Sequence, residues 1–120
     1  MLLVGVPTTI DTFAAITATR TGSGVLARFI KGESVVFRCN YTVNSGTTPT
    51  FDVKIQHAPS DTSTEYVDLV AFSQVTATSG SGVLEVHLPS ATMGIFPHLR
   101  AVSTITGTLN VDATVTIHTN

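Results

Sequence analysis

The sequence predicts an all-β chain that folds as a single antiparallel β-sandwich of about eight strands. Thr occurs 21 times, and this β-branched residue favours a pleated, half-buried surface over a helix. Apolar and polar residues alternate along short segments, which indicates strands with one buried face. Turn residues separate these segments at intervals of about 8–12 residues, a spacing typical of a sandwich or small barrel. Jelly-roll and Ig-like Greek-key connections are both compatible with this pattern.

The length of 120 residues fits one domain with one core. We expect residues 1–11 to form an extended N-terminal arm and residues 12–120 to form the sandwich domain. Hydrophobic residues make up 42% of the chain and charged residues only 12%, about half the usual charged share. Because surface charge normally keeps free proteins apart, we expect neighbouring molecules to cover part of this surface.

The first third of the chain contains three expected strands. The segment 12–20 (TFAAITATR) has two alanines that favour a helix, but its Phe, Ile and Thr residues also allow a strand. The segment 25–30 (VLARFI) alternates and lies between two turn signals. The clearest strand is 34–43 (SVVFRCNYTV), where apolar side chains recur at every second position. We expect a loop over 44–49 (NSGTTP).

The rest of the chain continues the alternation. The polar stretch 58–64 (APSDTST) is expected to be a turn, and 89–97 (PSATMGIFP) a loop or a single helical turn. In the expected strand 50–57 the residues Phe51, Val53, Ile55 and His57 alternate with polar residues and are expected to face inward. The remaining expected strands are 65–77 (broken or bulged near Ala71), 83–88, 98–107 and 112–119.

Composition excludes several classes of protein. The net charge is −2 and the six cationic residues are dispersed, so the chain lacks the basic patch of a nucleic-acid-binding protein. Cys39 is the single cysteine, which rules out an internal disulfide, and its place in an alternating segment predicts a buried thiol. The apolar start MLLVGVPTTI lacks the features of a signal peptide, and no segment has transmembrane length. We therefore expect synthesis in the cytoplasm and no membrane partner.

Candidate chemistry is sparse. The four histidines include no H-x-H pair, and the region around Asp61 lacks the D-x-D-x-D-G spacing of a calcium loop, so we expect no metal. Asx- and Ser/Thr-turns account for that loop without an ion. No G-x-S-x-G motif or phosphate loop is present, and the sequon at Asn40 lies in the middle of an expected strand. Tyr66 could stack on a sugar, although a core or rim position is the simpler interpretation. We expect no enzymatic activity and no cofactor.

Residues 50–119 contain a series of short motifs whose order resembles that of a known family. A strand F-x-V-K-I-Q (Phe51–Gln56) precedes a short turn that contains Ser60 and Asp61. An aromatic–x–Asp segment (Tyr66–Asp68), an F-x-x-V strand (Phe72–Val75) and an L-R-A-V strand that ends in a Gly turn (Leu99–Gly107) follow. This arrangement resembles small β-sandwich virion proteins of tailed bacteriophages. The family's usual Trp in the returning strand is Tyr66 here, a conservative change for packing.

The resemblance implies a non-enzymatic structural protein, best matched by a capsid decoration (cement) protein. Such a protein would bind the major capsid protein on the outside of the shell, at subunit junctions, and associate with itself as a trimer or dimer. Its location would be the capsid surface of the virion, after synthesis in the host cytoplasm. The alternatives are a tail, neck or fibre-associated virion protein, and a carbohydrate-binding sandwich that reads its ligand with loops 58–64 and 89–97.

Two apolar segments are candidate partner-binding surfaces. The N-terminal arm could bury apolar area on a partner or complete the protein's own sheet. The loop MGIFP could form a docking patch or cover the core. The candidate residues are Leu2, Leu3, Val4, Val6, Met93, Ile95 and Phe96.

Overall fold

A computed structural model describes residues 7–27, 34–89 and 95–119. The described chain is all-β, as predicted, with one three-residue 3-10 turn (Ser63–Glu65) between strands. Hydrogen bonds join its strands into one seven-stranded antiparallel sheet. The strands are β1 (Thr8–Ile16), β2 (Arg20–Thr21), β3 (Val25–Leu26), β4 (Val35–Ala58), β5 (Val67–Ala71), β6 (Gly80–Leu88) and β7 (His98–Thr119). β1 thus begins within the segment that the sequence assigned to an arm.

Two very long strands organise the fold. β4 and β7 pair antiparallel from Val35↔Thr119 to Ala58↔His98, so they form one continuous ribbon. The ribbon bends where its register shifts between Thr47 and Thr50, opposite Gly107. The expected loop over 44–49 is therefore part of a strand, because bulges let pairing continue through the bend.

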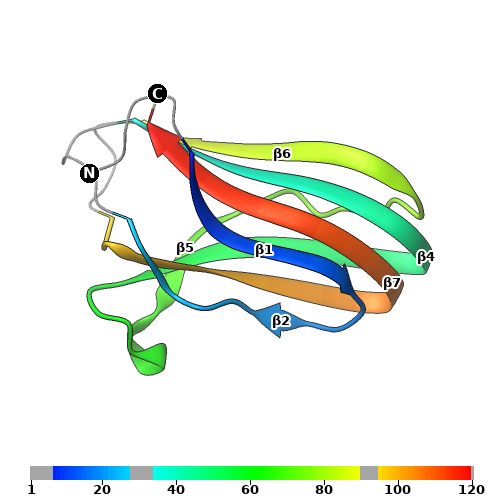
Figure 1. Ribbon diagram of the computed structural model, residues 1–120, viewed down its shortest axis with the longest axis horizontal. Helices are drawn as coiled ribbons and strands as arrows, with labels where there is room; N and C mark the ends of the chain where they lie inside the picture. Colours follow the sequence, from blue (N-terminus) through cyan, green and yellow to red (C-terminus); the bar gives the residue numbers. More distant parts are fainter. Residues whose placement is uncertain (1–6, 28–33, 90–94, 120) are drawn as a thin grey trace.

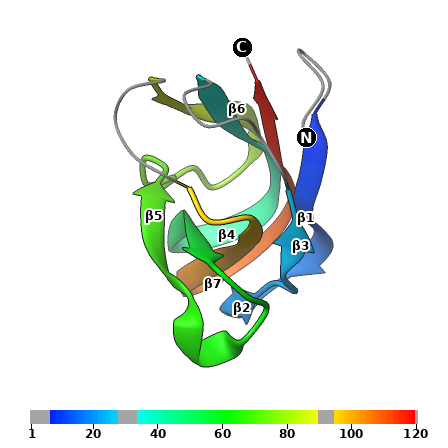
Figure 2. The ribbon, with the colours of Figure 1, turned by 90° about the vertical axis from the view of Figure 1, so that its left-hand side faces the viewer.

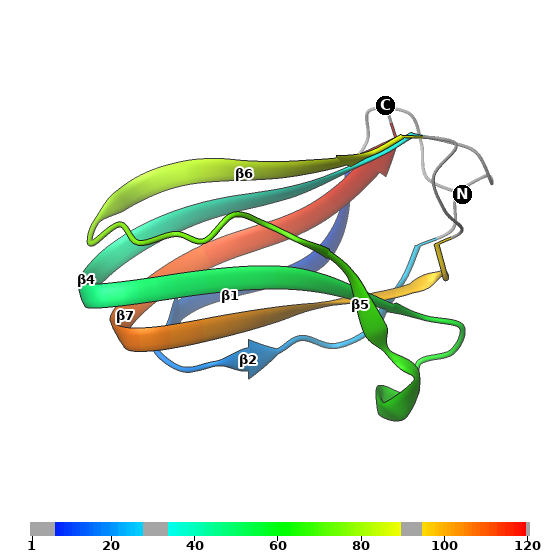
Figure 3. The same ribbon diagram turned by 180° about the vertical axis from the view of Figure 1, so that it is seen from behind.

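Folding of this ribbon produces two layers, which Figures 1 and 3 show from opposite sides. The first layer consists of β1, the C-terminal half of β7, the N-terminal half of β4, and β6. The second consists of β2 and β3, the N-terminal half of β7, the C-terminal half of β4, and β5. A sandwich-like arrangement results, in which both layers belong to one hydrogen-bonded sheet.

The core lies between the layers and uses mainly every second residue of β4 and β7. The expected inward residues of segment 50–57 are buried, including Phe51, Val53 and Ile55, and they meet Phe37 and Ile117 from the first layer in one apolar cluster. The prediction of a buried thiol at Cys39 is confirmed, and burial raises its pKa to about 12. Such a thiol is inert, since the thiolate is the reactive form.

An ion pair links β1 in the first layer to β2 in the second. Arg20 donates from Nη2 to Oδ1 of Asp11 at 2.7 Å and from Nε to Oδ2 at 3.1 Å, while its guanidinium lies 5.6 Å from the centre of the Phe13 ring. The Asp11 side chain is only 7% exposed and that of Arg20 is 39% exposed. The two-pronged geometry fixes the edge strand to the neighbouring segment.

Candidate interaction surfaces

Two of the seven candidate partner-binding residues can be placed. Leu2, Leu3, Val4, Val6 and Met93 lie outside the described residues. Ile95 is partly buried and packs against the core cluster, which agrees with a covering role. Phe96 is 46% exposed, so the same short segment also presents an apolar side chain to solvent.

Phe96 is held in place by His57, an inward-facing residue of β4. The backbone N–H of Phe96 donates to Nδ1 of His57 at 3.0 Å, and the two rings lie 4.9 Å apart. His57 is buried, and this burial lowers its pKa because the charged imidazolium would lose its hydration. A neutral imidazole that accepts the Phe96 N–H is thus the form that fits this contact.

Three exposed apolar side chains lie at the same end of the second layer: Leu26, Val67 and Phe96, which we call the apolar end. Leu26 pairs with His98 in β7, and Val67 pairs with His57 in β4. The three side chains are 46–53% exposed. Figure 2 views the molecule from this end, where β3 and β5 flank β4 and β7. Leu26 shares a face with His98, whereas Val67 shares the opposite face with His57, so the apolar end consists of separate exposed side chains rather than one flat patch.

A polar network crosses the outside of the second layer. Arg100 in β7 donates from Nε to Oε1 of Gln56 at 2.8 Å, and its guanidinium lies 4.1 Å from the centre of the Tyr66 ring. Gln56 in turn donates to Asp68 at 2.9 Å, and Lys54 forms an ion pair with Asp68 at 3.0 Å. These five residues belong to the K-I-Q, Y-V-D and L-R-A-V segments of the resemblance, and the fold joins them into one network.

Tyr66 also anchors the turn that precedes β5. Its hydroxyl donates to Oδ1 of Asp61 at 2.8 Å, and the residue is 8% exposed. Burial, followed by the hydrogen bond to Asp61, raises the Tyr66 pKa to about 12. A Cβ on Gly24 would clash with this hydroxyl and with Oδ1 of Asp61, so a larger residue there would displace the hydrogen-bonded pair. The Tyr66 ring therefore supports the core rim and the turn, and Arg100 already occupies a place over its face.

The outside of the first layer carries a shallow groove of about 640 Å³. Its polar lining comes from Thr12, Asn40, Thr42, Ser81, Asp112 and Thr114. Hydroxyls pair across strands, as in Thr12–Thr114 at 3.2 Å and Thr42–Ser81 at 2.9 Å, while Asp112 accepts the N–H of Ala15 at 2.6 Å. A surface of this kind offers neutral hydrogen-bonding groups and one carboxylate.

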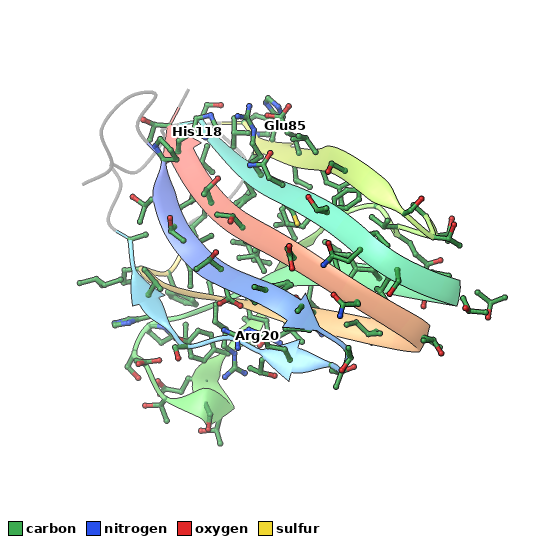
Figure 4. All side chains as sticks on the ribbon, turned by 45° about the vertical axis from the view of Figure 1, so that its right-hand side comes forward. Arg20, Glu85 and His118 are labelled. Atoms are coloured by element: carbon green, nitrogen blue, oxygen red, sulfur yellow. The ribbon has the colours of Figure 1, made fainter. Side chains whose placement is uncertain are left out.

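A charged cluster lies near the other end of the same layer. Arg38 donates from Nη2 to Oε2 of Glu85 at 2.9 Å and from Nε to the same oxygen at 3.3 Å. Hydrogen bonding to Arg38 is the main cause of a lowered Glu85 pKa, and the Coulombic interactions with Arg38, His87 and His118 act in the same direction. Figure 4 shows Glu85 and His118 near the same end of the layer. The arrangement is an exposed cross-strand ion pair, which contributes little to stability.

The potential metal ligands of the described residues are dispersed. No group of three or more His, Cys, Asp or Glu side chains there is arranged to hold a metal ion. In residues 7–27, 34–89 and 95–119, no helix has the length and apolarity needed to cross a membrane.

The chain matches no protein-family model and no curated protein. What can be proposed about its role therefore depends on its residues and their arrangement.

Proposed function

We propose that the chain is a non-enzymatic structural protein of a tailed-phage virion, which binds the major capsid protein at subunit junctions on the outside of the shell and stabilises it. The main support is the use of the motif residues. Lys54, Gln56, Tyr66, Asp68 and Arg100 are bound to one another across β4, β5 and β7. These motif residues contact one another and hold the sheet together, which fits a structural protein better than a catalyst.

The surface is consistent with this role. Charged residues are few, and the cross-strand hydroxyl pairs Thr12–Thr114 and Thr42–Ser81 lie on the first layer. Neutral hydroxyls can form contacts between molecules without the large desolvation penalty of buried charge. The apolar end adds side chains that gain free energy on burial, at about 25 cal/mol per Å². Contacts that are weak individually become strong when a shell repeats them many times.

Binding to expanded shells provides the direct test. The purified chain would be mixed with expanded capsids that lack it, and co-sedimentation and resistance of the capsids to heat would be measured. We expect saturable binding and increased resistance. Replacing Leu26 and Phe96 with Ser should weaken binding, whereas an exposed substitution at the bend of β7, Thr106→Ser, should leave it unchanged. Absence of binding to any shell would refute the decoration role.

Immunogold labelling of virions distinguishes decoration from the closest alternative. Label over the head supports decoration, and label confined to the tail or neck supports a tail, neck or fibre-associated role.

Carbohydrate binding is the second candidate function, because the hydroxyl and amide groups that line the groove on the first layer match the hydrogen-bonding groups of a sugar. The groove, rather than loops 58–64 and 89–97, is the observation that favours it. Saturable binding on a glycan array that is lost in Asn40→Ala and Asp112→Ala would support this function over decoration.

A further inference from the structure

β6 differs from every other edge of the described sheet. β1 is interrupted by register shifts at Thr9/Asp11 and Phe13/Ile16, and β2 and β3 have two residues each. β5 has five residues and a register shift opposite Ile55/Gln56. Bulges and short strands are the devices by which proteins prevent their edges from pairing with other chains.

The β6 edge lacks these devices. Its nine residues pair with β4 without a register shift, from Val35↔Leu88 to Val43↔Gly80. No described strand pairs with its other side, and β6 forms the upper rim of the molecule in Figures 1 and 3. The strand contains neither Lys nor Pro, so an open row of backbone N–H and C=O groups faces outward.

The side chains of β6 also lack full cover. Leu84, Val86 and Leu88 face the core but are only partly buried, whereas their neighbour Phe37 in β4 is completely buried. On the outer face, Val83 is 57% exposed. A further strand beside residues 84–88 would pair with their outward backbone groups and cover this apolar row.

We infer that the partner strand is β6 of a second copy of this chain, paired antiparallel about a two-fold axis at Val86. Inward residues must oppose inward residues, so the axis has to pass through a residue. An axis at Val86 places Glu85 opposite His87 of the partner copy, and Leu84 opposite Leu88 of the partner copy. Residues 84–88 of the strand are thus complementary to themselves in this register.

Neighbouring registers are less favourable. An axis at Glu85 would place two carboxylates opposite one another, and an axis at Leu84 would set Glu85 against Val83. The Glu85 carboxylate can also accept a hydrogen bond from a second donor. Both bonds from Arg38 end on its Oε2. Within the described residues Oε1 has no hydrogen-bond donor, so an imidazole N–H from the partner copy can reach it.

A disulfide trap tests both the surface and the register. In the proposed pair the two Val86 Cα atoms lie about 4.5–5.5 Å apart, within the range that a disulfide spans. Val86→Cys should therefore form a covalent dimer under mild oxidation. Val83→Cys is the matched control on the same strand, because the two copies of residue 83 would lie about 20 Å apart. The native Cys39 does not interfere, because it is buried.

Analytical ultracentrifugation of the unmodified chain provides the second measurement. We expect a monomer–dimer equilibrium, and His87→Glu should raise the dissociation constant about tenfold because two Glu–Glu pairs replace two Glu–His pairs. Thr12→Glu on β1 is a matched control that should not change it. A monomer at all concentrations, equal cross-linking of both cysteine variants, or an unchanged dissociation constant in folded His87→Glu would each overturn the inference.

This inference specifies a surface for the self-association expected of a shell protein, but it rests on β6 alone. A chain that dimerises through β6 and binds no capsid would refute the proposed function and leave the inference intact. A monomer that binds capsids would refute the inference and leave the proposed function intact.

Discussion

Replacement of Arg100 tests whether the motif network is structural. Arg100→Ala removes the guanidinium from the Tyr66 ring, at 4.1 Å, and the 2.8 Å hydrogen bond to Gln56. A partly exposed cation–π contact contributes about 1 kcal/mol, and a hydrogen bond from a charged group about 1.5 kcal/mol. After allowance for solvent screening, we expect a loss of about 2 kcal/mol in the free energy of unfolding.

This loss should be easily measured as a shift in Tm. Unfolding entropy is about 2.1 cal/mol/K per residue, which gives about 0.25 kcal/mol/K for 120 residues. A loss of about 2 kcal/mol therefore lowers Tm by roughly 8 °C. Differential scanning calorimetry would measure the shift. Arg100→Lys should lower Tm by about half as much, because the ammonium keeps its charge but loses the planar fork.

Arg38→Ala is the matched control for this experiment. Arg38 also donates to a side chain of a neighbouring strand, but the side chains of Arg38 and Glu85 are 42% and 38% exposed. We expect little change in Tm, since exposed ion pairs contribute little. If Arg100→Ala unfolds at the same temperature as Arg38→Ala, the motif network does not stabilise the fold. A normal Tm together with lost capsid binding would assign Arg100 to a partner interface instead.

Three further perturbations test other parts of the fold. Arg20→Met leaves the Asp11 carboxylate buried and unpaired, so urea unfolding should show a loss of about 1–2 kcal/mol in the free energy of unfolding. Adding Asp11→Asn to this variant should recover part of the loss. An unchanged free energy in Arg20→Met would contradict a stabilising role of the ion pair. Because burial lowers the His57 pKa, the unfolded chain binds a proton first, and stability should fall as pH decreases below about 6.5 until the folded pKa is reached. His57→Gln should flatten that decrease, and an identical pH profile would refute the assignment. Gly107→Ala should lower the free energy of unfolding by about 2 kcal/mol more than Gly80→Ala. Both glycines have a positive φ, but only at Gly107 would a Cβ meet the backbone, 2.5 Å from the carbonyl oxygen of Thr48. Equal losses would show that the bend adapts to the added Cβ.

Local sequence pattern was sufficient for the fold class and for much of the core. Alternation in 50–57 placed Phe51, Val53 and Ile55 on the buried face, and the structure agrees. Cys39 was recognised as buried from the same pattern. Side-chain direction in a strand reverses at each residue, so such assignments depend only on near neighbours in the sequence.

Continuity of the long strands was not evident from the sequence. The turn-like residues over 44–49 and the Gly-containing stretch after 106 predicted separate strands, but β4 and β7 pair through both. Each stretch lies opposite the other, so the bulges on one strand are matched by the bend on its partner. Pairing of this kind depends on residues about 60 positions apart, which no local pattern reports.

The candidate surfaces, too, were only partly predictable from the sequence. The sequence by itself identified the strands, the buried face of each, the scarcity of charge and the apolar segment that contains Phe96. Only the tertiary structure brought Arg100 onto the ring of Tyr66, placed His57 beneath Phe96 and left β6 at an open edge. The physical reason is that burial within a strand follows from its own alternation, whereas neighbours across a sheet, and the strand that has none, are decided by how the whole chain folds.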